Sequence, residues 1–285
     1  MRLTYNFKSK AYVYWKYTRG WKGAHYNATG GDDAVFAADP ETIDSFEIGL
    51  HGTWLTGKVT ADFALFHYNY QDYQLFTVQQ RFSSFPEFVV INAPNSEIYG
   101  AELDIGIRPL PGMLLFARLA WLETQFLDYT QIQVERREFG FANSIIVNNE
   151  ISNTGEPLLN SPRFKLSLTA QQTVPLGNSG TLTARWDGAW TDDVRFDATQ
   201  TRGIPNEFGD QFLPKNTIGQ PAYWRHNLRV AYRTPNGQVE VAGWVRNLKD
   251  KVFKAYAFDV SSFNGTTVFF LGEPRTYGVS LQTAF

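Results

Sequence analysis

The stretch from Glu97 to Arg108 reads EIYGAELDIGIR and, from Tyr99 onward, alternates between two kinds of side chain. From that point one parity is wholly apolar, with Tyr99, Ala101, Leu103, Ile105 and Ile107. The other parity carries Glu102, Asp104, Gly106 and Arg108. Successive side chains of a β-strand point to opposite faces. The stretch therefore predicts a strand with one uncharged face and one charged face.

The same alternation recurs along the chain, most clearly in residues 163–174, 181–190 and 223–233. Helical periodicity is almost absent. Apolar and polar residues that alternate over several segments are typical of half-buried strands. The sequence therefore predicts an all-β protein.

Composition narrows the class further. Charged residues make up 19% of the 285 residues and aromatic residues 16%, with Phe 23, Tyr 14 and Trp 8, whereas soluble domains average about 25% charged. A mean hydropathy of -0.30, with no apolar run near the length of a membrane helix, argues against a transmembrane helix. It leaves open a membrane β-barrel, whose alternating strands average to mild hydropathy. The net charge of -2 excludes nucleic-acid binding through bulk positive charge.

Strands and connections alternate in a regular way. The predicted strands are 2–6, 11–19, 42–53, 58–73, 97–108, 113–126, 162–174, 181–195, 223–234, 238–246 and 275–285. The short connections between them are 7–10, 54–57, 109–112, 175–180 and 235–237, and the long ones are 20–41, 74–96, 127–161, 196–222 and 247–274. Short turns at one end and long loops at the other are typical of outer-membrane barrels. The sequence therefore predicts an antiparallel transmembrane β-barrel.

A large soluble β-sandwich or propeller is the alternative fold, because it also contains alternating strands. Such folds cover their apolar face with a second layer, and their loops have no reason to alternate in length. A face in contact with lipid explains both the missing charges and the Trp and Tyr residues near strand ends. We therefore favour the membrane barrel.

The opposite parity supplies the face that would line the barrel lumen. Its members are Glu47, His51, Asp62, Glu102, Asp104, Arg108, Arg118, Lys165, Arg185, Asp187, Arg225, Arg229, Arg233, Glu240 and Arg246. An Arg or Lys at the lipid midplane costs about 2–4 kcal/mol, so this wall must be wet or covered by protein. These side chains either form cross-strand pairs in a wet lumen, or they bind an internal plug or guide a solute.

Eleven strands are an odd number, whereas bacterial single-chain barrels have even numbers. An unpaired strand edge in lipid is strongly unfavourable. The count therefore predicts that the chain is the C-terminal part of a larger barrel. Its first residues also lack the apolar core of a signal peptide.

Short motifs along the chain carry a family resemblance. The stretches are VRNLKDKVF (245–253), GEPRTYGVSLQTAF (272–285), PETIDSFEIGLH (40–51), NAP with YGAELD (92–94 and 99–104) and YTRGWKG (17–23). Together they resemble the C-terminal β-barrel of TonB-dependent outer-membrane receptors. Three positions depart from the family pattern: Phe253 replaces a Tyr, His51 replaces a basic residue and Pro94 replaces a Gly.

The resemblance implies a barrel of 22 strands, of which residues 1–285 form about half, with the plug domain and TonB box upstream. It implies uptake of a large scarce solute, typically a ferric siderophore, haem, cobalamin or a glycan, driven by the TonB complex. A ferric siderophore or similar iron complex is the expected substrate, and the outer membrane of a Gram-negative bacterium is the expected location. A passive porin or a structural outer-membrane barrel without TonB coupling remains the alternative.

Catalytic chemistry is not indicated. The four histidines, His25, His51, His67 and His226, lack the spacing of a metal site, and the chain has no cysteine. No nucleophile elbow, P-loop or dinucleotide motif occurs. We therefore expect no enzyme activity, cofactor or bound metal, and no nucleic-acid partner.

Aromatic and basic residues in the long loops are candidate ligand contacts. They are Trp21, His25, Tyr26, Arg195, Arg202, Phe208 and Phe212. Aromatic rings and Arg can hold a planar anionic ligand, such as a catecholate complex, by stacking and cation–π contact. Anchoring at the membrane interface and loop packing explain the same residues equally well.

The chain's last strand provides a candidate signal for insertion into the membrane. Tyr277, Val279, Leu281 and the terminal Phe285 share one parity. We expect the barrel-assembly machinery to recognise this aromatic end, and the finished barrel to contact outer-membrane lipid.

Overall fold

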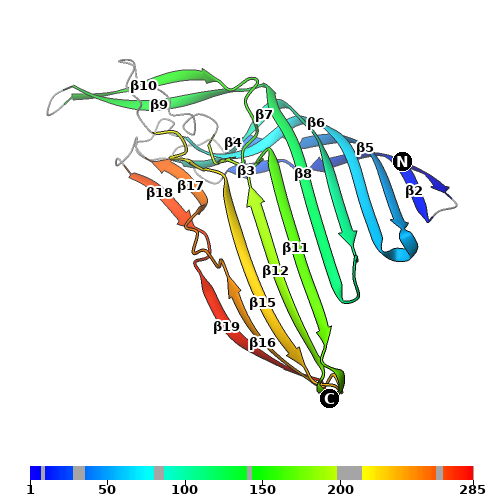
Figure 1. Cartoon of the computed structure of the whole chain (residues 1–285). Helices are drawn as coiled ribbons and strands as arrows, with labels where there is room; N and C mark the ends of the chain where they lie inside the picture. Colours follow the sequence, from blue (N-terminus) through cyan, green and yellow to red (C-terminus); the bar gives the residue numbers. More distant parts are fainter. Residues whose placement is uncertain are drawn as a thin grey trace.

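The computed structural model describes residues 1–7, 10–27, 36–79, 87–139, 143–197, 214–260 and 266–284. Its main element is one curved sheet of eleven strands (Figure 1). In spatial order these are β1 (Arg2–Phe7), β2 (Ala11–Lys22), β5 (Glu41–Trp54), β6 (Val59–Gln79), β7 (Glu87–Ile107), β8 (Met113–Asp128), β11 (Phe164–Pro175), β12 (Thr181–Thr191), β15 (Tyr223–Arg233), β16 (Val239–Arg246) and β19 (Thr276–Thr283). Every neighbouring pair is antiparallel, which confirms the predicted fold class.

The register of the strands sorts the side chains onto two faces. One continuous row of paired residues contains Trp15, Ile48, Leu65, Ala101, Trp121 and Phe164. A row of the opposite parity contains His51, Asp62, Asp104 and Arg118. We call these sides the apolar face and the charged face.

No second layer covers the apolar face in the part of the chain that the structure describes. Ile48 is 54% exposed and Leu65 is 43% exposed, although both lie well inside their strands. A soluble sandwich would bury such side chains against a facing sheet. The exposed apolar face therefore agrees with the membrane-barrel prediction and not with the soluble alternative.

The short connections lie at one end of the sheet and include the 3₁₀ turns η1 (Leu55–Gly57) and η2 (Gly177–Ser179). Gly112 shows why one of them needs its glycine. Its φ is +73°, and an added Cβ would lie 2.1 Å from the carbonyl oxygen of Thr173. Only glycine combines this backbone conformation with so close an approach.

The other end of the main sheet carries four two-stranded sheets, and the green pair and the orange pair stand out in Figure 1. The four sheets pair β3 (His25–Asn27) with β4 (Phe36–Ala38), β9 (Thr130–Phe139) with β10 (Asn143–Ser152), β13 (Val194–Arg195) with β14 (Gly219–Gln220), and β17 (Lys254–Val260) with β18 (Thr266–Leu271). The strands β6 and β7 also extend beyond their predicted ends at 73 and 97. These hairpins correct the expectation of plain loops in 20–41, 74–96, 127–161, 196–222 and 247–274.

A small hydrophobic core lies at this end of the sheet, around the extended ends of β6 and β7. Leu75, Val89 and Ile91 from the β6–β7 extension pack with Phe126 and Leu158, and each is at most 9% exposed. The burial of several large apolar side chains removes apolar surface from water and so stabilises the folded extension. The β6–β7 extension is therefore a packed structural unit.

Side-chain amides join the β3–β4 hairpin to this unit. The Asn27 amide donates to the carbonyl of Val90 and its Oδ1 accepts from the Val90 N–H, both at 2.8 Å. Asn92 Nδ2 donates to the carbonyls of Asp39 at 3.1 Å and Asp72 at 2.7 Å, and Asn92 Oδ1 accepts from the Asp39 N–H at 2.7 Å. The bonds of Asn27 with Val90 and of Asn92 with Asp39 join segments far apart in the sequence through side chains, without backbone-to-backbone pairing.

Asn92→Ala is expected to loosen the β3–β4 hairpin, because it removes the two hydrogen bonds to Asp39, the residue after β4. The site is partly open to water, so we expect a loss of about 1–2 kcal/mol in local stability. Limited proteolysis of the assembled protein measures this as faster cleavage near the hairpin. The matched control is Asn95→Ala, at an exposed position whose side chain is not used in this contact. Equal cleavage rates in both variants would contradict the expectation.

The segment after β16 forms a second tight contact. Asn247 is 4% exposed, and its Nδ2 donates to the carbonyls of Lys251 at 3.0 Å and Glu273 at 3.1 Å. The N–H of Gly272 donates to the carbonyl of Phe253 at 2.8 Å. These bonds tie together the two stretches before β17 and before β19, and we call the arrangement the C-terminal clasp.

Two further observations complete the fold. Within the described ranges, no helix is long and apolar enough to cross a membrane. The strands β1 and β19 form the two edges of the main sheet, since β1 pairs with β2 and β19 pairs with β16.

Candidate functional site

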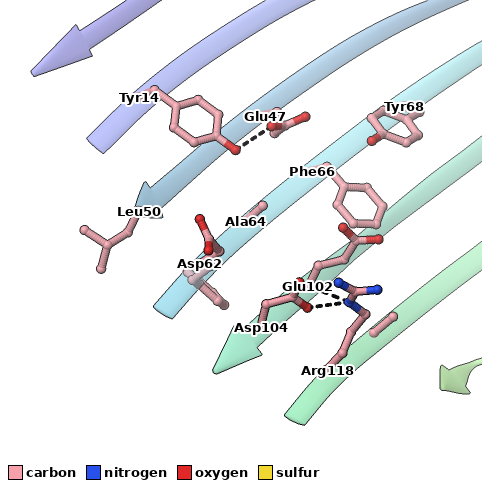
Figure 2. A pocket seen from close by; sticks show the side chains of 12 residues that line it. Tyr14, Glu47, Leu50, Asp62, Ala64, Phe66, Tyr68, Glu102, Asp104 and Arg118 are labelled. Atoms are coloured by element: carbon pink, nitrogen blue, oxygen red, sulfur yellow. Dashed lines mark hydrogen bonds and ion pairs between the residues drawn. The ribbon is translucent and has the colours of Figure 1, made fainter. Parts of the chain in front are cut away.

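The charged face is hollowed where β2, β5, β6, β7 and β8 lie side by side (Figure 2). The hollow has a volume of about 460 Å³. Its lining includes four carboxylates, from Glu47, Asp62, Glu102 and Asp104. All four had been predicted to face the lumen from the alternation of the sequence alone.

Basic and phenolic groups hold most of these carboxylates. Glu47 accepts hydrogen bonds from Tyr14 Oη at 2.6 Å and from Lys16 Nζ at 2.8 Å. Arg118 Nε donates to both carboxylate oxygens of Asp104, at 2.9 and 3.0 Å, and Asp62 contacts His51. The Arg118 side chain is 61% exposed, so its pair with Asp104 orients the groups more than it stabilises the fold.

Two glycines allow aromatic rings to lie across this face. A Cβ added to Gly49 would lie 2.5 Å from the Tyr14 ring. A Cβ added to Gly100 would lie 2.8 Å from the ring of Phe66 and 2.2 Å from the backbone oxygen of Trp121. The rings of Tyr14 and Phe66 therefore occupy space that any other residue on the neighbouring strand would fill.

The charged face continues beyond the hollow toward β16. Arg185 donates to Asp187 at 2.8 Å, and Thr169 donates to the same carboxylate at 2.7 Å. Farther along, Arg229 donates to Glu240 at 2.6 Å. These cross-strand and same-strand pairs support the interpretation that many of the charged residues stabilise a wet wall.

The loop residues predicted to contact ligand fall into separate places. Trp21 is 71% exposed and has the parity of Trp15, which belongs to the apolar face. His25 and Tyr26 lie in β3, where Tyr26 is 67% exposed. Arg195 lies in β13, and its Nη1 donates to Glu156 Oε2 at 2.7 Å. The other three candidates, Arg202, Phe208 and Phe212, lie outside the described residues.

A second small core supports β13 and the β17–β18 hairpin. Phe196, Ile218 and Ala257 are buried together, and Tyr256 packs against them. Lys254 donates to the carbonyls of Asn216 and Thr217, at 2.7 and 2.9 Å. Burial lowers the pKa of Lys254 below its ordinary value because it disfavours the charged ammonium. Its hydrogen bonds to carbonyls show that this cation serves the loop structure.

The expected insertion signal lies on the edge strand β19. Tyr277 is 77% exposed, Val279 77% and Leu281 69%, and Phe285 lies outside the described residues. The pairing of β16 with β19 puts Tyr277 opposite Val245 and Val279 opposite Gly243. The apolar side chains of this strand are thus available to another surface.

Sequence analysis missed the aromatic residues on the charged face. Phe66, Tyr68 and Tyr70 follow one another at every second position of β6 and share the parity of Asp62. These rings carry no charge, and charge is what marks the lumen-facing parity in the sequence. Counting every residue of that parity on β6 would have found these rings.

A curved antiparallel sheet with one bare apolar face, one charged face and long connections at a single end defines a membrane-barrel wall. The model of the family described as "TonB dependent receptor-like, beta-barrel" matches residues 2–248. The chain therefore belongs to the TonB-dependent receptor β-barrel family, a family of transport receptors.

Solved structures agree on the fold. The ferric yersiniabactin uptake receptor FyuA from Yersinia pestis is 18% identical, with a TM-score of 0.71, and the match covers 100% of this chain and 36% of that one. BauA, the ferric preacinetobactin receptor from Acinetobacter baumannii, is 17% identical, with a TM-score of 0.64, and 98% of this chain and 35% of that one are covered. The copper transporter OprC is 15% identical, with a TM-score of 0.67, and 100% and 38% are covered. The chain thus spans about a third of the length of these three receptors.

Proposed function

We propose that this chain forms part of the barrel wall and the extracellular loops of a TonB-dependent importer in the outer membrane of a Gram-negative bacterium. The family match over residues 2–248 is the observation that carries the proposal. The cargo is a ferric siderophore or a similar iron complex. Structural relatives described as receptors for ferric yersiniabactin and ferric preacinetobactin support this choice.

The apolar face contacts lipid in this proposal. On β6 the apolar parity runs from Val59 to Leu65 and ends at His67, which bonds to Glu97 at 2.6 Å. From Val59 to His67 the strand advances about 26 Å at about 3.3 Å per residue. A tilt of about 40° reduces this to about 20 Å of height, close to the apolar band of about 25 Å in outer-membrane barrels.

Residues 1–285 belong to the barrel in this proposal, and the plug and the segment that contacts TonB belong to another part of the protein. The share of the solved receptors that the chain spans supports this division. The charged face then contacts plug, solute or water. The barrel-assembly machinery recognises the last strand, with Tyr277, Val279, Leu281 and Phe285.

Copper is a second candidate cargo because one structural relative is a copper transporter. Soft copper(I) prefers thiolate and thioether ligands. The chain has no cysteine, and its two methionines are Met1 and Met113. Residues 1–285 therefore supply no thiolate ligand for copper(I), and an iron complex remains the proposed cargo.

Uptake by iron-starved cells tests the proposal. Cells that express the complete gene are expected to accumulate iron from ferric siderophores, and a mutation that inactivates TonB is expected to abolish the accumulation. A passive porin predicts the opposite result, with diffusion of small sugars that does not depend on TonB. Uptake that persists without TonB would reject the proposed function in favour of the porin.

A further inference from the structure

Four aromatic side chains of β6 form a line on the charged face: Phe66, Tyr68, Tyr70 and Tyr73. We call this line the aromatic track. Phe66 pairs in register with Glu47, Tyr68 with Ser45 and Tyr70 with Ile43, so these three rings share one face. The track begins in the hollow and leads toward the long-loop end of the strand.

A break in the alternation keeps Tyr73 on the track. Strict alternation would turn Tyr73 away from Tyr70, since the two are three positions apart. Asp72 between them has a φ of +56°, in the left-handed region. The ring of Tyr73 instead meets that of Tyr70 edge-on, with 5.3 Å between centroids, and lies 6.4 Å from the ring of Phe126.

The lower part of the track is equally well ordered. The rings of Phe66 and Tyr68 stack with centroids 4.9 Å apart and planes inclined by 20°. All four side chains of the track are half-buried, so each keeps part of its surface open. A row of ordered and partly open rings offers repeated stacking positions to a molecule that moves along the wall.

Carboxylates border the track along its length. Glu47 pairs in register with Phe66, and Glu102 lines the hollow together with Phe66 and Tyr68. Glu41 Oε2 accepts a hydrogen bond at 2.8 Å from the N–H of Gln74, the residue after Tyr73. Two cations of the same part of the wall, Lys16 and Arg118, are each held by a carboxylate. Glu102 is exposed on this face and pairs in register with Ala64. A polyanion would meet repulsion here, whereas a cation would be attracted both to the carboxylates and to the ring faces.

We propose that the aromatic track is a solute-contact surface that favours uncharged or cationic iron complexes over polyanionic ones. The inference rests on the proposed function and specifies its substrate class. A ferric trihydroxamate with a free ammonium group fits this surface, because its flat hydroxamate groups can stack and its ammonium can approach the carboxylates. A ferric tris-catecholate, which is a polyanion, fits it poorly.

The experiment compares both complexes, labelled with radioactive iron, in cells that express the complete gene and its variants at matched surface levels. Tyr68→Leu and Tyr70→Leu each remove one ring of the track. Phe46→Leu is the matched control, since Phe46 is an aromatic residue of the apolar face on the neighbouring strand β5. Glu102→Gln removes one bordering charge without changing the size of the side chain.

Wild type is expected to take up the trihydroxamate at a lower half-saturating concentration than the tris-catecholate. Each track variant is expected to raise that concentration about tenfold, as the loss of one aromatic contact predicts, and Phe46→Leu is expected to leave it unchanged. Glu102→Gln is expected to narrow the difference between the two complexes.

Three results would overturn the inference in distinguishable ways. Track variants that behave like Phe46→Leu, while wild type imports the trihydroxamate, would reject the contact surface and leave the proposed function standing. A tris-catecholate imported as well as the trihydroxamate by wild type would reject the charge preference. Failure of wild type to import either complex would reject both the inference and the iron-complex cargo of the proposed function.

Discussion

Arginine in place of Leu65 is expected to destabilise the assembled protein by about 2 kcal/mol, the lower end of the midplane cost, because Leu65 lies between the middle of the lipid-facing part of β6 and its end at His67. Leu65 pairs with Ile48 and Ala101 on the apolar face and is 43% exposed. The neighbouring Ala64 faces the hollow and pairs with Gly49 and Glu102. Arginine at position 64 points into the hollow and has the carboxylate of Glu102 on the neighbouring strand, so we expect a change below about 1 kcal/mol.

A comparison of these two variants distinguishes a sheet that contacts lipid from a soluble sheet. Leu65→Arg and Ala64→Arg differ by one position and add the same side chain. The amount of protein assembled in the outer membrane, and the temperature at which it loses resistance to SDS, measure the effect in cells. Near-wild-type assembly of Leu65→Arg would show that the apolar face does not lie in lipid.

Alanine in place of Gly272 is expected to destabilise the C-terminal clasp by about 3 kcal/mol, at the upper end of overpacking effects. An added Cβ would lie 1.9 Å from Cζ of Phe253. That ring is 8% exposed and has little room to move, because Tyr223 stacks on it at 4.7 Å and the Arg225 guanidinium lies 5.3 Å from its centroid. The backbone bond from Gly272 to Phe253 would lengthen or break.

Gly243→Ala is the control for this substitution. Gly243 lies in β16, and a Cβ added there meets nothing within 4 Å. Both variants add one methyl group in place of a glycine, so the reduced conformational entropy of the unfolded chain is shared. Heat-induced loss of the folded form is expected at a lower temperature for Gly272→Ala than for Gly243→Ala. The role assigned to the clasp would be refuted by equal temperatures.

Long strands with regular alternation could be predicted from the sequence, because the polarity of each residue indicates the face of the sheet on which it lies. Residues 99–107 show this, because the charges of Glu102 and Asp104 on either side of Leu103 identify which parity is polar. The upper part of β6 gave no such signal. Tyr73 follows a left-handed Asp72, and Leu75 is buried in a local core, so apolar residues no longer mark one face.

The site was predictable only in part, for a related reason. Side-chain charge identified Asp62, Asp104 and Arg118 because lipid excludes charge from the opposite face. The partner of Arg195 could not be foreseen, since Glu156 lies 39 positions earlier and depends on how two local hairpins fold. The Asn27 and Asn92 contacts likewise need the folded loops, because polar side chains at loop positions usually meet water.

The direction of the two edge strands limits what can complete the ring. Eleven strands that alternate in direction leave β1 and β19 pointing the same way. Two copies of this sheet related by a rotation about the membrane normal would pair β19 of one copy with β1 of the other. These two strands would be parallel, whereas every neighbouring pair within the sheet is antiparallel. A closed barrel in which every strand pair is antiparallel needs an odd number of further strands between β19 and β1. Strand direction alone therefore favours closure of the barrel by strands of a different polypeptide segment over closure by a second copy of this sheet.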